Sequence, residues 1–238
     1  SYKNVGNYRV MRLTQFLTLA VAMSRNQAKY SIRKGRTCVD GKVIIDPNFE
    51  VFDHNNVTFD SNPISIVKYQ YFMLNKPASF TCTTVESEEK SVLNLIKKRS
   101  KAKNHYLGNI LSDDVTGLVL ISDNARWANR TKLKTLEKIS VYQLKTKKIV
   151  TDDQVLKMKE AFLTSGKRQV GSEIDIQKKD EQTLMLSIKH FSLTDLINIC
   201  NSKNIQIVNK HLQQVGALEL GDLKAGDYLE LTEKDIRL

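Results

Sequence analysis

The chain has 238 residues, of which 41% are hydrophobic and 26% charged, a composition typical of a folded protein with a proper core. No apolar run approaches the roughly 18 residues that a membrane helix needs, so we expect no membrane-spanning segment. The three cysteines, Cys38, Cys82 and Cys200, are widely spaced, which favours free thiols over a disulfide framework. The four histidines are scattered and there is no Cys-x-x-Cys, so we expect neither a metal site nor a cofactor.

The formal net charge is +11, and the positive residues are clustered. Residues 1–39 contain eight Lys or Arg and no acid, and residues 97–103 contain five more. Residues 126–148 add eight against a single acid, Glu137. Separate basic clusters favour a polyanionic partner such as nucleic acid, although solubility or an organelle with a basic proteome would also explain them.

After a polar extension predicted at residues 1–8, apolar positions between Leu13 and Val21 follow helical spacing. Ser24 and Gln27 have the spacing of a capping box and predict a second helix that ends at Gly35. Strands at 37–39 and 42–45 then flank an Asp40-Gly41 turn, and 51–59 is extended. These elements predict a first domain at residues 9–60.

The order helix, helix, hairpin, with Arg12-Leu13, Ser24-Arg25, Gly35-Arg36 and Asp40-Gly41-Lys42, resembles the alpha-L RNA-binding domain. Basic residues recur every three or four positions along the second helix and its exit, a pattern that suits the phosphates of folded RNA. A solvated helix face is the alternative. The candidate RNA-binding residues of this domain are Arg12, Arg25, Lys29, Arg33, Lys34, Arg36 and Lys42.

A linker is predicted at residues 61–68 and a second domain at residues 69–238. Apolar runs predict strands at 71–75, 118–121, 139–145 and 184–188, which we expect to share one sheet. Helices are predicted at 92–98, 125–136, 155–163 and 193–200, and residues 164–182 are predicted to be a loop or hairpin. Trp127 is either a core residue or an exposed ring that stacks on a base. The predicted fold class is α+β, with a mainly antiparallel sheet in the second domain.

Residues 106–123 resemble the signature of the RsuA-type pseudouridine synthases, Tyr-Pro-x-Gly-Arg-Leu-Asp-x-x-Thr-x-Gly-Leu-Leu-Leu-Leu-Thr-Asn-Asp. Tyr106, Leu111, Gly117, Leu118 and Leu120 keep the residue of that family. The Leu-Asn-Lys-Pro segment at 74–77, Glu137-Lys138 and the strands at 215–235 are also similar to the family. The resemblance covers residues 9–238, and it implies a synthase-like second domain that acts on RNA.

The chain departs from the family where the resemblance would place chemistry. The catalytic Asp falls on Ser112, an Arg on Ile110 and a stacking Tyr on Ser140, with Tyr142 two residues further along the same strand face. The charged Glu-Gly-Arg motif has no counterpart at residues 190–199. A one-residue shift of the loop makes Asp113 a fallback catalyst, although an aspartate is also common in turns. The candidate RNA-binding residues of this domain are Lys97, Lys98, Arg99, Arg126 and Arg130.

These departures lead us to expect a non-catalytic protein that binds structured, ribosomal RNA as a structural or assembly component of a ribosome, beside neighbouring ribosomal or assembly proteins. The alternatives are an active ribosomal RNA pseudouridine synthase that uses Asp113, and an RNA-binding regulator outside the ribosome. The composition, rich in Lys, Asn and Ile, favours a mitochondrial ribosome, with a cytoplasmic location as the alternative.

Overall fold

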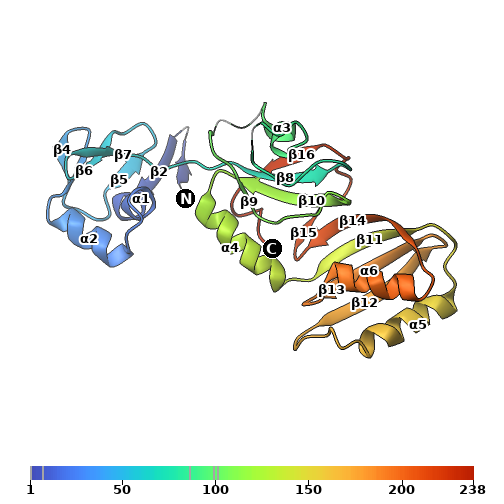
Figure 1. Cartoon of the computed structure of the whole chain (residues 1–238). Coiled ribbons are helices and arrows are strands. Elements are labelled where there is room, and N and C mark those ends of the chain that lie inside the picture. Colours follow the sequence, from blue (N-terminus) through green and yellow to red (C-terminus); the bar gives the residue numbers. More distant parts are fainter. Residues whose placement is uncertain (1, 7, 86, 99, 101) are drawn as a thin grey trace. The chain divides into compact units, whose positions relative to one another are not determined.

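The computed structural model describes residues 2–6, 8–85, 87–98, 100 and 102–238. It divides into two compact units, Ser1–Lys68 and Tyr69–Leu238. The first unit contains two short helices and seven short strands among the described residues, and the second contains a large sheet with four helices (Figure 1). Each unit is described by itself below.

Unit 1 buries the apolar sides of two helices against two small sheets. The sheets have the strand orders β1-β2-β5 and β4-β3-β6-β7. Leu13, Phe16 and Leu17 of the first helix meet Ala28 and Ile32 of the second in one buried cluster. The elements are β1 (Lys3–Val5), β2 (Tyr8–Arg12), α1 (Leu13–Ala20), α2 (Arg25–Arg33), β3 (Thr37–Val39), β4 (Lys42–Val43), β5 (Glu50–Phe52), β6 (Val57–Phe59) and β7 (Asn62–Ile64).

Local sequence signals explain where α2 and the β3–β4 hairpin begin and end. The Ser24 side chain accepts a hydrogen bond from the Gln27 amide, and the Gln27 side chain accepts one from the Ser24 amide, which completes the predicted capping box. In the hairpin turn, Asp40 and Gly41 have φ values of 48° and 80°, as a type I′ turn requires at both central positions. The predicted helices and hairpin are therefore confirmed.

Two segments of this unit differ from the sequence-based expectation. The predicted extension at 1–8 contains β1, which pairs with β2, and the predicted linker at 61–68 contains β7, which pairs with β6. All three residues of β1 are exposed, so no apolar pattern marks the strand. Pro63 lies in the edge strand β7, where the missing amide hydrogen is tolerated.

Unit 2 is built on a nine-stranded sheet with the order β12-β13-β11-β14-β10-β8-β16, to which β9 and β15 add at the side. Among the described strands, β10 and β14 form the parallel pair, and every other pair is antiparallel. The strands are β8 (Tyr71–Lys76), β9 (Tyr106–Leu107), β10 (Val115–Ser122), β11 (Ser140–Thr146), β12 (Glu173–Asp180), β13 (Thr183–Lys189), β14 (Ile207–Val215), β15 (Leu218–Glu219) and β16 (Tyr228–Leu231). The four strands predicted from sequence lie in this sheet, so the predicted α+β class with a mainly antiparallel sheet is confirmed.

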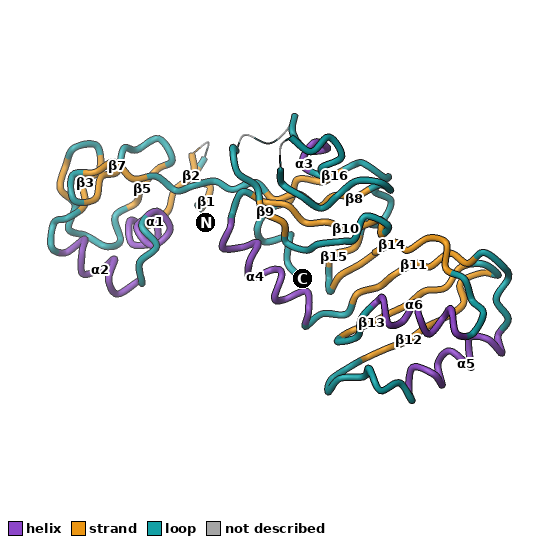
Figure 2. The backbone as a smooth tube through the Cα atoms, viewed as in Figure 1, coloured by secondary structure: helices purple, strands orange, loops and turns teal. Residues whose placement is uncertain are grey.

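The helices of unit 2 are α3 (Leu93–Ile96), α4 (Ala125–Leu136), α5 (Asp152–Leu163) and α6 (Leu193–Ser202). Helices α5 and α6 lie beside the β11–β13 end of the sheet (Figure 2) and bury Met158, Phe162 and Leu196 against it. Helix α4 packs on the other half through Trp127, whose ring meets Tyr71 edge to face with 5.1 Å between centroids. Trp127 is therefore a core residue and not a surface ring.

In the part of the chain that the structure describes, no helix combines the length and apolar character needed to cross a membrane.

Candidate functional site

The loop that joins β9 to β10 forms one wall of an open pocket of about 380 Å³ in unit 2, called the loop pocket below. The remaining walls come from β11, β14 and α6, so four segments that are distant in sequence meet there. The lining residues are Ile110, Leu111, Ser112, Asp114, Val115, Tyr142, Leu193, Thr194, Ile197, Asn198 and Lys210.

Lys76, at the end of β8, fastens this loop through its backbone. The side chain is fully buried, and its ammonium group donates hydrogen bonds to the carbonyl oxygens of Phe80 at 2.7 Å and of Pro77 and Asp113 at 3.3 Å each. Burial lowers the pKa of Lys76, while the nearby Cys82, Asp113 and Asp114 act in the opposite direction. Because the acceptors are backbone oxygens, this contact of Lys76 with the loop requires no particular side chain at position 113.

Two further contacts hold the loop. The buried Asn109 side chain donates to the Leu118 carbonyl at 2.9 Å and accepts from the Leu120 amide at 2.8 Å, so it replaces a strand partner for β10. The Leu111 amide donates to Cys82 Sγ at 3.4 Å. The loop is therefore anchored to β10 and to the segment after β8 by contacts that do not involve the side chains of the loop pocket.

Gly117 permits the close approach of β10 to β14. Its φ is 115°, and a Cβ atom there would lie 2.2 Å from the carbonyl oxygen of Leu212. No other residue type could occupy this position without moving one of the two strands. The glycine of the signature is thus explained by the parallel β10–β14 pair, which also brings Lys210 to the loop.

The charged groups of the loop pocket are Asp114 and Lys210. The Lys210 ammonium donates to a carboxylate oxygen of Asp114, and this hydrogen bond is the main reason that the pKa of Asp114 is lowered. The carboxylate is therefore ionised and partnered at neutral pH. Asp113, the fallback catalyst considered above, is exposed and is not among the lining residues of the loop pocket.

The aromatic group of the loop pocket is Tyr142, which lies on β11 next to the α6 wall. Burial raises the pKa of its phenol to about 12, so the hydroxyl is a neutral donor at neutral pH. Ser140, which falls on the family tyrosine, lines a neighbouring hollow of about 430 Å³ together with Tyr142 and His190. Ser112 and Ser140 therefore lie in different hollows, and Tyr142 borders both.

Helix α6 gives the loop pocket an uncharged wall. Ser192 caps the helix by accepting from the Asp195 amide, and the helix then presents Leu193, Thr194, Ile197 and Asn198 to the loop pocket. The sequence of α6 contains no Lys or Arg. Apart from Lys210, the loop pocket therefore has no cation among its lining residues with which to hold a phosphate.

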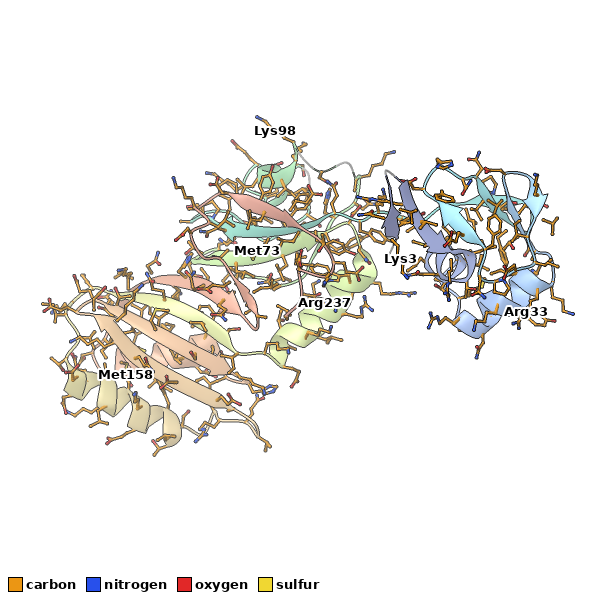
Figure 3. The ribbon with its side chains drawn as sticks, turned by 180° about the vertical axis from the view of Figure 1, so that it is seen from behind. Lys3, Arg33, Met73, Lys98, Met158 and Arg237 are labelled. Carbon is orange, nitrogen blue, oxygen red and sulfur yellow. The ribbon has the colours of Figure 1, made fainter. Side chains whose placement is uncertain are left out.

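The candidate RNA-binding residues of unit 1 divide into two groups. Arg12, Arg25, Lys29, Arg33, Lys34 and Lys42 are exposed, and Arg33 projects outward from α2 (Figure 3). Arg36 is instead engaged within the unit: it donates two hydrogen bonds to Asp60, of 2.8 and 2.5 Å, and lies 4.5 Å from the Phe59 ring centroid. The charge of Arg36 is thus already partnered, and the exposed row on α2 is the stronger candidate interface.

The candidates in unit 2 are spread over two elements. Lys97 and Lys98 are exposed directly after α3, and Lys98 extends into solvent (Figure 3). Arg126 and Arg130 are exposed on α4. Arg99 lies outside the described residues. Within the described part of the chain, no cluster of three or more His, Cys, Asp or Glu side chains could hold a metal ion.

Sequence reasoning missed Lys210 and the role of Lys76. Lys210 lies 96 residues from its partner Asp114, and only the strand pairing brings them together. The Leu-Asn-Lys-Pro segment is recognised from the sequence, but no role is predicted for its lysine, which is fully buried. The available signal was a lysine that directly follows the predicted strand at 71–75 and precedes a proline.

The mainly antiparallel sheet, the loop after β9 and the loop pocket together define a protein of the pseudouridine synthase fold. A solved structure described as a pseudouridylate synthase matches 94% of this chain and 97% of its own, with a TM-score of 0.56 and 21% identity. No family model matches the chain. In sequence, the chain is similar to ribosomal small subunit pseudouridine synthase A of Escherichia coli strain K12, with 26% identity over 95% of this chain and 98% of the relative. The enzyme of the same name from Salmonella typhimurium is 27% identical over the same shares. In sequence and in fold, the chain is thus similar over nearly its whole length to pseudouridine synthases of the RsuA type.

Proposed function

We propose that the protein is a non-catalytic RNA-binding member of this family, which serves as a structural or assembly component of a ribosome. The observation that carries the proposal is Ser112, which lines the loop pocket at the position where the family signature has its catalytic aspartate. A serine hydroxyl is a nucleophile only beside a general base. No histidine lines the loop pocket, and its Asp114 and Lys210 are paired with each other. Ile110 and Ser140 replace the arginine of the signature and the stacking tyrosine of the family as well.

The RNA-binding part of the proposal rests on charge and on relatives. The net charge is +11, and α2 carries an exposed basic row without an acid. Similar proteins are named for a ribosomal small subunit, so ribosomal RNA is the proposed partner. Binding should depend strongly on salt, because each neutralised phosphate releases counterions.

Catalysis is tested by tritium release from ribosomal RNA that contains 5-tritiated uridine. We expect no release by the purified protein above that of heat-inactivated protein, with an active relative as the positive control. Release that is abolished in either Asp113→Asn or Asp114→Asn would contradict the proposal and identify the catalyst.

The second candidate function is an active pseudouridine synthase. For this function, Asp114 is a better candidate for the catalytic carboxylate than Asp113. Asp114 is the carboxylate that lines the loop pocket, and Tyr142 lines the same pocket. The lowered pKa of Asp114 would keep its carboxylate ionised, as a nucleophile requires, but the carboxylate already accepts a hydrogen bond from Lys210. If the protein is active, Asp114→Asn should abolish turnover and Asp113→Asn should not.

We propose a mitochondrial ribosome as the place of action. Sedimentation of a lysate from the native source tests this: the protein should travel with a ribosomal subunit and leave that fraction after ribonuclease treatment. Recovery in free fractions with other RNA would instead support a regulator outside the ribosome.

A further inference from the structure

Tyr30 is an aromatic residue on the solvent side of α2 and lies outside the hydrophobic core of unit 1. The buried residues of the helix are Ala28, Ser31 and Ile32, whereas Tyr30 is 62% exposed. An aromatic side chain usually contributes a large buried area to a core. The Tyr30 ring contributes little buried area to the core, so a ligand outside the unit would explain its presence.

The surroundings of the ring are cationic. Arg33 and Lys34 follow Tyr30 by three and four positions, the spacings at which helical side chains are neighbours. Lys34 Nζ lies 5.5 Å from the ring centroid, within the range of a cation–π contact. Lys29 precedes the ring, and α2 contains no acid.

The same surroundings favour a nucleic-acid base over an apolar protein surface. On the helix, the neighbours of Tyr30 on the other side are Asn26 and Gln27, so the ring is a single apolar group within a polar face. Protein docking sites usually show a contiguous apolar patch. A flat ring bordered by cations instead matches an unpaired base and the phosphates on either side of it.

We propose that Tyr30 stacks on an unpaired base of the bound RNA while Lys29, Arg33 and Lys34 neutralise the neighbouring phosphates. The inference rests on the proposed RNA-binding function and makes it more specific. The basic residues of a helix recognise the shape and charge of the RNA backbone. With the Tyr30 ring, α2 also selects an RNA loop or bulge over a continuous duplex.

The test uses the full-length protein and two RNA duplexes of equal length, one regular and one with a single bulged 2-aminopurine. The wild-type protein should prefer the bulged RNA and quench the fluorescence of the bulged base. Tyr30→Ala should lose about 5- to 150-fold in affinity for the bulged RNA, the range expected for one stacked base. Its affinity for the regular duplex and the salt dependence of its binding should remain unchanged, because no charge is removed.

Two variants control the experiment. Tyr30→Phe keeps the ring and should retain both the affinity and the quenching. Tyr69→Ala removes another exposed ring, which is 41% exposed, and should behave as the wild type.

The possible failures are distinguishable. If Tyr30→Ala binds the bulged RNA as tightly as the wild type does, stacking is overturned and the ring is left for a protein contact. Equal losses on both duplexes would also overturn it, because the ring would then not sense the unpaired base. If the wild-type protein binds neither RNA, the proposed function itself fails.

Discussion

At the scale of single residues, Tyr142 couples the stability of unit 2 to alkaline pH. Burial raises its pKa from 10.0 to about 12. In the unfolded chain the phenol loses its proton from about pH 10, whereas in the folded protein it keeps the proton until about pH 12. The stabilisation from the neutral buried phenol is therefore complete below about pH 10 and is lost as the pH rises to about 12.

We predict that Tyr142→Phe will lose less stability than the wild type over this interval. The measurement is the free energy of unfolding in urea at a series of pH values from about 8 to about 12. Tyr69→Phe, at an exposed position, is the control and should follow the wild-type curve. Parallel curves for wild type and Tyr142→Phe would show that the phenol does not titrate differently in the two states.

A second prediction at this scale concerns Gly117. Its Cβ would lie 2.2 Å from the Leu212 carbonyl oxygen, and its φ of 115° is unfavourable for other residues. Gly117→Ala should lower the free energy of unfolding by about 3 kcal/mol or more, because backbone strain and overpacking each cost about 1–3 kcal/mol. Gly166→Ala is the matched control, since nothing lies within 4 Å of its Cβ position. Similar denaturation midpoints for the two variants would contradict the close approach of β10 and β14.

At the scale of elements, α2 is the part of unit 1 that we expect to govern RNA affinity. Reversal of Arg25, Lys29 and Arg33 to Glu should weaken binding to structured RNA and reduce the slope of log affinity against log salt by about three units. The measurement is a binding titration at several salt concentrations.

The control for this prediction is a second triple variant, with the same change of charge at positions outside α2. Lys203, Lys224 and Lys234 are exposed and lie outside the candidate interface, so their reversal should change affinity and slope less. Arg36 is unsuitable for reversal, because the loss of its pair with Asp60 would disturb the fold of unit 1. Equal losses in the two triple variants would mean that net charge, and not α2, governs binding.

The elements that could be predicted from sequence are those with local causes. Helix α2 is fixed by the Ser24–Gln27 capping box, and the β3–β4 hairpin by its Asp40-Gly41 turn. Strands β1 and β7 were missed because backbone pairing at a sheet edge leaves exposed or irregular side chains. The composition of the loop pocket was only half predictable: Ser112 belongs to the signature, but Lys210 arrives through a strand pairing across 96 residues.

At the scale of the whole molecule, the two units have separate hydrophobic cores. The core of unit 1 contains side chains from Met11 to Val57, and the two clusters of unit 2 begin at Tyr71 and at Leu144. We therefore predict that residues 1–68, produced alone, will give a cooperative denaturation curve and retain salt-dependent RNA binding. A fragment that lacks a cooperative transition would show that unit 1 depends on the rest of the chain.

The pairing of β16 with β8 has a consequence for the order in which the protein forms during synthesis. Gln70, beside β8, donates a hydrogen bond to Glu230 in β16 across 160 residues of sequence. Contacts between such distant segments form slowly, whereas unit 1 is a compact unit that precedes β8 in the chain and closes its own contacts within residues 1–68. During synthesis, unit 1 can therefore fold before β8 pairs with its outer partner strand β16.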